Sequence, residues 1–374
     1  MNENENLVPK RRFKEFTNTG TWEQRKLGDM VEFFSGLTYS PDNVIKQPGT
    51  LVLRSSNVQN GEIVNADNVY VDNEVVNSDN VQVGDIAVVV RNGSRSLIGK
   101  HAAIKYPMKD TVIGAFMTGV RSDTPSFTNA LLDTQQFETE IAKNLGATIN
   151  QITTGNFKKM IFNFPEIDER LRIGDFFNQL DNTIALHQRK LEKSKALKSA
   201  YLSEMFPAEG ERKPKRRFAG FTDDWEQRKL GETVQITMGQ SPSGENYTEN
   251  PKDYILVQGN ADMKNGRVVP RVWTTQVTKK ADPEDIILSV RAPVGDVGKT
   301  DYPVVLGRGV AGIKGNAFIF QTLSRMKEIG FWTRYSSGST FESINSADLK
   351  DAVIQIPNIE EQIKIGEFFT KLDD

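Results

Sequence analysis

Cysteine is absent from the 374 residues of this sequence, and histidine occurs only twice. A chain without cysteine forms neither disulfides nor thiolate metal sites, which fits the reducing cytoplasm where we expect it to reside. The two histidines, His101 and His187, have no neighbours typical of a metal site or a serine–histidine triad. We therefore expect both to be structural or exposed, and we predict no catalytic residue and no bound metal in this chain.

Long hydrophobic runs and an excess of either charge are also missing. No stretch is apolar enough for a transmembrane helix, and the polar, acidic residues 1–6 do not resemble a secretory signal. Lys and Arg total 47 against 49 Asp and Glu. Any nucleic-acid contact would therefore depend on basic residues gathered on one face, because net charge supplies no attraction. The plain alternative is a neutral two-domain protein with scattered charges.

The most informative feature is a repeat of domain size. Residues 22–28 read Trp-Glu-Gln-Arg-Lys-Leu-Gly, and the same heptapeptide returns at 225–231. The two units also close alike, with Ile-Gly-x-Phe-Phe at 173–177 and 365–369. The spacing is that of a whole domain plus a connector, and too long for a solenoid repeat. One framework is therefore used twice, whereas the middle of each unit differs.

Each heptapeptide follows a Lys-Arg-Arg-Phe lead, at 10–13 and 215–218. We interpret these leads as solvated linkers, because short charge runs are usually exposed. The identity of the heptapeptides argues against base reading, which should differ between units. We expect their Trp and Leu to pack into each domain and their charges to face solvent or a partner.

The sequence predicts an α+β fold with two pseudo-repeated globular domains of mixed β-sheet and short helices. A long coiled-coil-type helix separates them, because 168–204 carries no proline and only one glycine, Gly174. Phe177, Ile184 and Leu191 recur every seven residues within it, with Leu180 at an intervening d position. The predicted boundaries are a polar and basic tail at 1–21, a first domain at 22–165, the spacer helix at 166–206, a linker at 207–224, a second domain at 225–357 and the start of a truncated distal helix at 358–374.

Polar and basic side chains follow several of the predicted strands. Arg suits guanine and Asn suits adenine in the major groove, whereas hydroxyl and basic groups also bind phosphate. The candidate DNA-binding residues of the first unit are Arg54, Ser55, Asn57, Arg91, Asn92, Ser94, Arg95, Lys100, Thr148 and Asn150. Those of the second unit are Gln258, Asn260, Arg291, Lys299, Arg308, Ser339 and Thr340. The alternative for each is a polar turn residue that contacts only water.

The order of these motifs resembles the specificity (S) subunit of type I restriction–modification enzymes. The resemblance covers nearly the whole chain, since opening heptapeptide, variable domain, closing motif and long helix recur in one order. It implies two target-recognition domains that each read half of a split double-stranded DNA sequence in the major groove. It also implies two antiparallel helices that dock two methyltransferase (M) subunits, which two restriction (R) subunits join. S-adenosylmethionine, ATP and Mg²⁺ would be bound by these partners, and no cofactor by this chain.

The short second helix departs from this family pattern. It leaves the stripe of Phe177, Leu180, Ile184 and Leu191 without its expected cover, so these four are candidate subunit-docking residues. A complex with one methyltransferase and completion by another subunit in trans both remain open.

We expect no catalytic chemistry in this chain. Gly295–Thr300 ends in Gly-Lys-Thr, but its spacing does not fit a Walker motif, and Asn163-Phe164-Pro165 is not an adenine-methyltransferase motif. We therefore predict a non-catalytic DNA reader without membrane partners. Two alternatives stay open, namely a self-sufficient methyltransferase or nuclease, and a pure protein-interaction scaffold.

Overall fold

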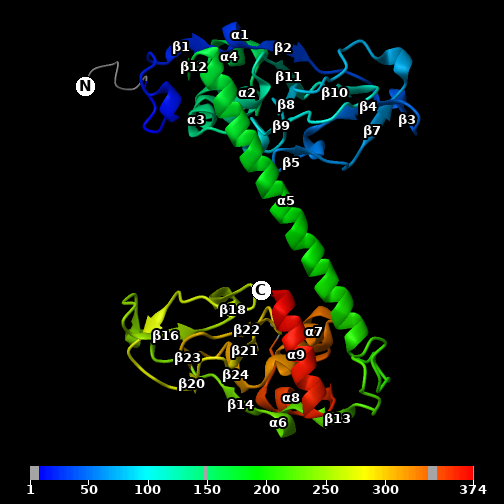
Figure 1. Ribbon diagram of the computed structural model, residues 1–374, viewed down its shortest axis with the longest axis vertical. Coiled ribbons are helices and arrows are strands. Elements are labelled where there is room, and N and C mark those ends of the chain that lie inside the picture. Colours follow the sequence, from blue (N-terminus) through cyan, green and yellow to red (C-terminus); the bar gives the residue numbers. More distant parts are fainter. Residues whose placement is uncertain (1–7, 146–149, 336–342, 374) are drawn as a thin grey trace. The chain divides into compact units, whose positions relative to one another are not determined.

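A computed structural model describes residues 8–145, 150–335 and 343–373 (Figure 1). The chain divides into two compact units, Met1–His187 and Gln188–Asp374, each of which is described by itself. The candidate contacts Thr148, Ser339 and Thr340 lie outside the described residues.

The first unit contains two four-stranded sheets among its described residues, ordered β10-β4-β7-β3 and β2-β11-β8-β9, and the pairs β1-β12 and β5-β6. Its strands are β1 (Glu23–Lys26), β2 (Glu32–Ser35), β3 (Val44–Ile45), β4 (Thr50–Leu53), β5 (Val58–Gln59), β6 (Glu62–Ile63), β7 (Val69–Val71), β8 (Ile86–Val89), β9 (His101–Ala103), β10 (Thr111–Ile113), β11 (Met117–Arg121) and β12 (Ile161–Phe164). Its α-helices are α1 (Leu27–Met30), α2 (Pro125–Leu132), α3 (Gln135–Asn144), α4 (Thr154–Lys159) and the first part of α5 (Ile167–Met205).

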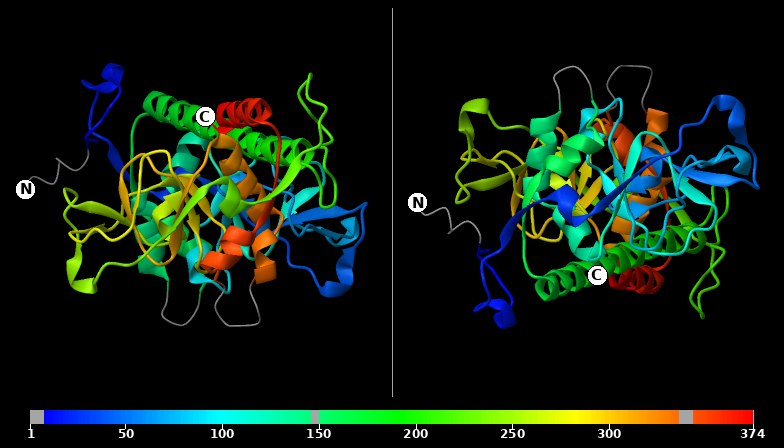
Figure 2. Two further views of the ribbon diagram at one scale, coloured as in Figure 1. Left: turned by 90° about the horizontal axis from the view of Figure 1, so that it is seen from below. Right: turned by 90° about the horizontal axis from the view of Figure 1, so that it is seen from above.

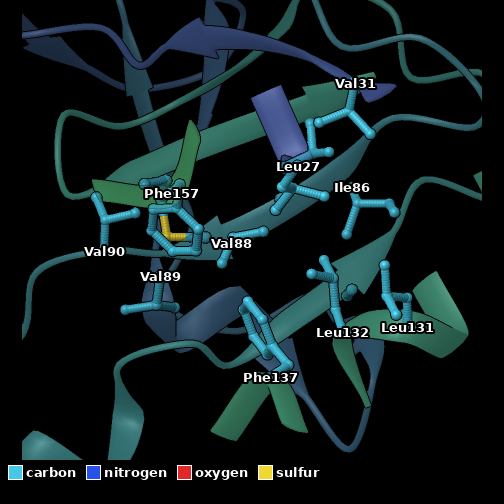
Figure 3. Packing of buried hydrophobic residues seen from close by; sticks show 14 of the residues in the cluster. Leu27, Val31, Ile86, Val88, Val89, Val90, Leu131, Leu132, Phe137 and Phe157 are labelled. Carbon is cyan, nitrogen blue, oxygen red and sulfur yellow. The ribbon is translucent and has the colours of Figure 1, made fainter. Parts of the chain in front are cut away.

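The core of this unit forms around β8, whose residues are all buried. A strand covered on both faces has to be apolar throughout, which explains the run Ile-Ala-Val-Val. Phe137 from α3 and Phe157 from α4 are buried in the same core, with ring centroids 6.1 Å apart (Figure 3). His101 on β9 is also buried, and its ring nitrogen lies 3.0 Å from the Gly99 carbonyl oxygen, so it is structural as expected.

The second unit contains two larger sheets among its described residues, ordered β14-β24-β21-β22-β18-β17 and β15-β19-β16-β23-β20, and the pair β13-β25. Its strands are β13 (Glu226–Lys229), β14 (Gln235–Met238), β15 (Tyr247–Thr248), β16 (Tyr254–Val257), β17 (Met263–Lys264), β18 (Arg267–Val268), β19 (Trp273–Thr274), β20 (Lys280–Ala281), β21 (Ile286–Ser289), β22 (Val297–Lys299), β23 (Val304–Leu306), β24 (Val310–Lys314) and β25 (Val353–Ile356). Its α-helices are α6 (Leu230–Thr233), α7 (Ala317–Glu328), α8 (Ser346–Asp351) and α9 (Ile359–Asp373), and α9 packs on α7 (Figure 1 and Figure 2).

The repeated heptapeptide opens each unit in the same way. Its second to fifth residues form β1 and β13, which pair antiparallel with β12 and β25 near the end of each domain. Leu27 and Leu230 are fully buried, whereas the charged strand residues are exposed. A Cβ atom on Gly28 would lie 2.7 Å from Lys158 Cβ, and one on Gly231 would lie 2.8 Å from Lys350 Cβ, so only glycine fits. The heptapeptide therefore closes each domain, as its identity in both units suggested.

The interpretation of the Lys-Arg-Arg-Phe leads as solvated linkers is correct for the first two basic residues of each lead, which are exposed, but wrong for the second arginine. Arg12 donates two hydrogen bonds to Glu169 at 2.7 and 2.6 Å, and both side chains are almost entirely buried. Arg217 makes the same bidentate bond to Glu361, at 2.7 Å twice. These hydrogen bonds raise the pKa of both guanidinium groups. The sequence gives no local sign of the pairing, because each glutamate lies far along the chain.

The predicted α+β fold and the long helix are confirmed. α5 covers 39 residues. Its first part belongs to the first unit and the rest to the second. Its end is more than a spacer, because Leu202, Met205 and Phe206 are buried in the core of the second unit. Phe206 stacks on Phe318 with ring centroids 5.4 Å apart. In the middle of the helix, by contrast, apolar side chains are exposed.

Candidate nucleic-acid interface

In the first unit, three of the predicted segments meet beyond the ends of β4 and β8. Asn92 Nδ2 donates a hydrogen bond to Ser55 Oγ at 3.0 Å, which joins the segment after β8 to the segment after β4. Asn150 Nδ2 donates to the Gly93 carbonyl at 3.0 Å, and Arg91 forms a β-bridge with Gln151. Residues that are far apart in the sequence therefore form one polar surface, which we call the first loop cluster: Arg54, Ser55, Arg91, Asn92 and Asn150.

An apolar side chain that the sequence analysis missed lies within this cluster. Phe116, in the connection between β10 and β11, is 54% exposed. Its carbonyl oxygen accepts hydrogen bonds from the N–H groups of Val90 and Arg91, at 3.0 and 3.2 Å. The Arg91 guanidinium carbon lies 5.0 Å from the centroid of the Phe116 ring, which is a cation–π contact. The only sequence signal was an aromatic residue in a turn that begins with glycine.

Asn57 is not a base contact, contrary to the prediction. The residue is fully buried, and its Nδ2 donates to the Ala66 carbonyl at 2.6 Å and to Asn68 Oδ1 at 2.9 Å. Its Oδ1 accepts from the Arg54 N–H at 2.9 Å. Asn57 is therefore committed to holding the loop after β4, and the amide has no group left to offer to DNA.

The remaining candidates of the first unit follow β8 but vary in their surroundings. Ser94 and Arg95 are exposed, and the Ser94 N–H donates to Asn92 Oδ1 at 3.0 Å. Lys100 is half-buried beside the end of β8, where its carbonyl accepts from the Val89 N–H at 2.8 Å. Neither Arg95 nor Lys100 has a side-chain hydrogen bond or ion pair among the residues that the structure describes. Both remain available for phosphate.

The second unit repeats this arrangement with other side chains. The Gly307 N–H donates to the Val257 carbonyl at 2.8 Å, as the Gly114 N–H donates to the Leu53 carbonyl in the first unit. The end of β16 with Gln258 thereby lies beside the turn that carries Arg308. Val290, just before Arg291, donates to the Gly309 carbonyl at 2.8 Å, and Arg291 forms a β-bridge with Ser343. We call the following residues the second loop cluster: Gln258, Arg291 and Arg308.

Tyr247 is a further residue that the sequence analysis missed. Its hydroxyl oxygen accepts a hydrogen bond from Gln258 Nε2 at 3.0 Å, which restricts the orientation of this amide. Asn260, two residues further on, is half-buried at the start of a 3-10 helix (Asn260–Asp262). The last residue of this 3-10 helix, Asp262, is fully buried and accepts a hydrogen bond from the Gln258 N–H at 2.7 Å. Asn57 accepts from the Arg54 N–H in the same way in the first unit. Arg308 is exposed, with its backbone N–H donating to Ser241 Oγ at 3.1 Å.

Lys299 does not belong to the second loop cluster. It pairs with Ile286 at the start of β21, whereas Arg291 follows the end of that strand. Its ammonium group lies 3.5 Å from a Glu284 carboxylate oxygen and 5.9 Å from the centroid of Phe320. Lys100 and Lys299 both follow a glycine but are not at equivalent positions, because Ile86, the counterpart of Ile286, pairs with Ala103.

The described residues contain no other site of obvious chemistry. Across 8–145, 150–335 and 343–373, no three His, Asp or Glu side chains come together as metal ligands. No helix in these same ranges is long and apolar enough to cross a bilayer. The two loop clusters thus offer arginine, amide and hydroxyl groups on frames of backbone hydrogen bonds, which suits recognition of base edges and phosphates.

Comparisons with known proteins identify the family of this chain. Residues 19–195 and 222–374 match the family of the type I restriction modification DNA specificity domain. The putative type I restriction enzyme MjaX specificity subunit of Methanocaldococcus jannaschii is 31% identical over 240 residues, which cover 61% of this chain and 55% of that protein. This chain thus spans little more than half the length of that relative.

Two solved structures share the fold. The S subunit of the type I restriction–modification system from M. genitalium aligns with a TM-score of 0.67 at 13% identity, covering 96% of this chain and 90% of the other. A chain of a type I system studied for complex assembly and conformational transition aligns with a TM-score of 0.51 at 21% identity, covering 94% of this chain and 90% of the other. Because the family match extends over most of both units, this chain belongs to the family of type I restriction–modification DNA specificity domains.

Proposed function

We propose that this chain is a DNA specificity subunit that reads a bipartite double-stranded target, one half with each unit. The observation that carries the proposal is the repetition of one loop frame with different side chains. The first loop cluster presents Arg91, with the side chains of Arg54 and Asn92 bonded to Asp67 and Ser55, whereas the second presents Gln258, Arg291 and Arg308. Two unlike readers on like frames suit an asymmetric sequence whose halves are separated by an unread gap.

The middle of α5 supports a second role as a scaffold. Phe177, Leu180, Ile184 and Leu191 are 42%, 44%, 48% and 54% exposed. A stripe of large apolar side chains along one helix is unusual on a surface that faces only water, and it is typical of a protein interface. We propose that methyltransferase subunits cover this stripe and that restriction subunits join the resulting complex.

The chemistry in this proposal belongs to the partners. S-adenosylmethionine, ATP and Mg²⁺ would be bound by methyltransferase and restriction subunits in the cytoplasm, and this chain would be non-catalytic. Its family relationship and the absence of recognisable catalytic motifs in its sequence support this assignment. Incubation of the pure chain with DNA, Mg²⁺ and S-adenosylmethionine tests it, because methylation or cleavage by the chain alone would contradict a non-catalytic role.

DNA reading is tested with arginine variants in complex with methyltransferase. Arg91→Ala and Arg291→Ala should each weaken binding to a target duplex by about 1–3 kcal/mol, as expected for loss of one bidentate base contact. Arg25→Ala is the matched control, because Arg25 is exposed but paired with Glu23 on the repeated heptapeptide. Fluorescence anisotropy at fixed salt measures the affinities. Unchanged binding by both cluster variants would favour a pure protein-interaction scaffold.

A further inference from the structure

Phe116 is the most exposed large apolar side chain near the first loop cluster, and its backbone is fixed. Hydrogen bonds from Val90 and Arg91 hold its carbonyl at the end of β8. The Gly114 N–H, bonded to the Leu53 carbonyl at 2.8 Å, anchors the same turn to β4. The turn that carries the ring is therefore anchored to two strands, and 54% of Phe116 is exposed. Exposing a phenylalanine forgoes about 2 kcal/mol of burial, so a surface that covers the ring would bind with a gain.

The contact with Arg91 gives the exposed ring a defined neighbour. The guanidinium lies over the Phe116 ring, and it makes no side-chain hydrogen bond or ion pair with any described residue. An arginine held by an aromatic face keeps its N–H fork free for the two acceptors of a guanine. An aromatic ring beside that fork would face the neighbouring base. In the major groove, the apolar group that a neighbouring base presents is the C5-methyl of thymine.

The second unit has a different surface at the equivalent place. Gly309 occupies the position of Phe116 in the second unit. Its carbonyl accepts a hydrogen bond from the N–H of Val290, just as the Phe116 carbonyl accepts one from the N–H of Val90. A Cβ atom on Gly309 would collide with the Gln258 carbonyl oxygen, so no side chain fits there. The frame is thus the same, but the first unit exposes an aromatic ring at this position, whereas Gly309 of the second unit is buried against the chain at Gln258.

We propose that Phe116 is a specificity-determining residue whose ring contacts the C5-methyl of a thymine next to the guanine read by Arg91. The half-site of the first unit then contains this thymine, and the half-site of the second unit is read without a matching contact. The inference rests on the proposed function, because it names a contact within the same DNA-reading surface.

The test uses the full chain in complex with methyltransferase. Mapping methylated adenines in cells that express the wild-type complex gives both half-sites. Phe116→Ala should relax selection at one thymine of one half-site and leave the other half unchanged, whereas Phe116→Leu should retain partial selection. Tyr106→Ala is the control, since Tyr106 is 73% exposed but lies in the turn between β9 and β10.

A second measurement starts from the wild-type complex, so its first result does not depend on how any variant folds. Replacing the selected thymine by deoxyuridine removes only its methyl group, and should weaken wild-type binding about fourfold, the equivalent of one buried methyl. The Phe116→Ala complex should bind both duplexes equally, and deoxyuridine in the other half-site should have no effect. A half-site without thymine, or a wild-type complex indifferent to deoxyuridine, overturns the inference alone. A wild-type complex that methylates without sequence preference overturns the proposed function as well.

Discussion

Replacing Glu361 by alanine should destabilise the second unit far more than replacing any exposed carboxylate. Glu361 is fully buried, and its partner Arg217 is 13% exposed, with both bonds at 2.7 Å. Removing the glutamate leaves a buried guanidinium without its counter-charge. Loss of one partner of a buried pair typically costs about 3–5 kcal/mol, because the remaining charge has been taken out of water without compensation.

The matched control is a pair of the same chemistry at the surface. Glu204 accepts from Arg216 Nε at 2.6 Å, but these side chains are 41% and 58% exposed. Water screens this pair, so Glu204→Ala should cost no more than about 1 kcal/mol. The double variant Arg217→Met with Glu361→Leu should regain most of the stability lost in Glu361→Ala, since it buries no unpaired charge.

Urea unfolding followed by tryptophan fluorescence measures these differences in the second unit. Of the four tryptophans in the chain, Trp225, Trp273 and Trp332 lie in this unit. The transition midpoint should fall strongly for Glu361→Ala and little for Glu204→Ala. Equal losses for the two variants would refute the reasoning, because they would show that burial of the pair carries no energetic weight.

Four further variants probe packing, subunit docking, conformation and charge. Phe206→Ala should lower the free energy of unfolding in urea by about 3–5 kcal/mol, because the ring is buried against Phe318. Phe177→Ala changes an exposed position, so it should alter the free energy of unfolding by no more than about 0.5 kcal/mol. The same variant should weaken methyltransferase capture in a pull-down. Gly309→Ala should lower the midpoint, since its Cβ collides with a carbonyl oxygen; an unchanged midpoint would show that the turn adapts freely. Burial, and to a smaller extent the charge of Asp133, raises the pKa of Asp181 in the folded protein. The folded state is therefore favoured while this carboxyl is protonated, below its unfolded pKa of about 3.9. That contribution to stability is lost as the pH rises through the higher folded pKa. Asp181→Asn should therefore unfold at a higher temperature than wild type at pH 7, with the difference vanishing near pH 3; an equal difference at both values would contradict this.

The features that were predictable from the sequence are those encoded locally. Three features can be recognised from a short stretch of sequence: the repeated heptapeptide, the apolar strand 86–89 and the proline-free stretch that forms α5. Hydrophobic period and helix-forming composition suffice for such features. Convergence of the polar segments was not predicted, because nothing local to Arg91 or Asn92 indicates that they meet Ser55 and Asn150.

The features that were missed depend on residues far along the chain. Arg12 and Glu169 are separated by 157 positions, so nothing near the lead indicates burial. Asn57 is a residue type that can contact a base, but its amide points inward and donates to a loop carbonyl. Phe116 is exposed because the turn that carries it is held at the end of β8. Local composition records which groups a loop contains, and only the tertiary hydrogen bonds decide which way they point.

Mapping N6-methyladenine in a methylation-deficient host that expresses this chain with methyltransferase subunits tests the central claim most directly. The account predicts a single asymmetric motif of two defined halves separated by a gap of constant length, with Arg91→Ala altering one half and Arg291→Ala the other. A continuous motif without a gap, or arginine variants that alter the same half, would contradict two separate readers on one repeated frame.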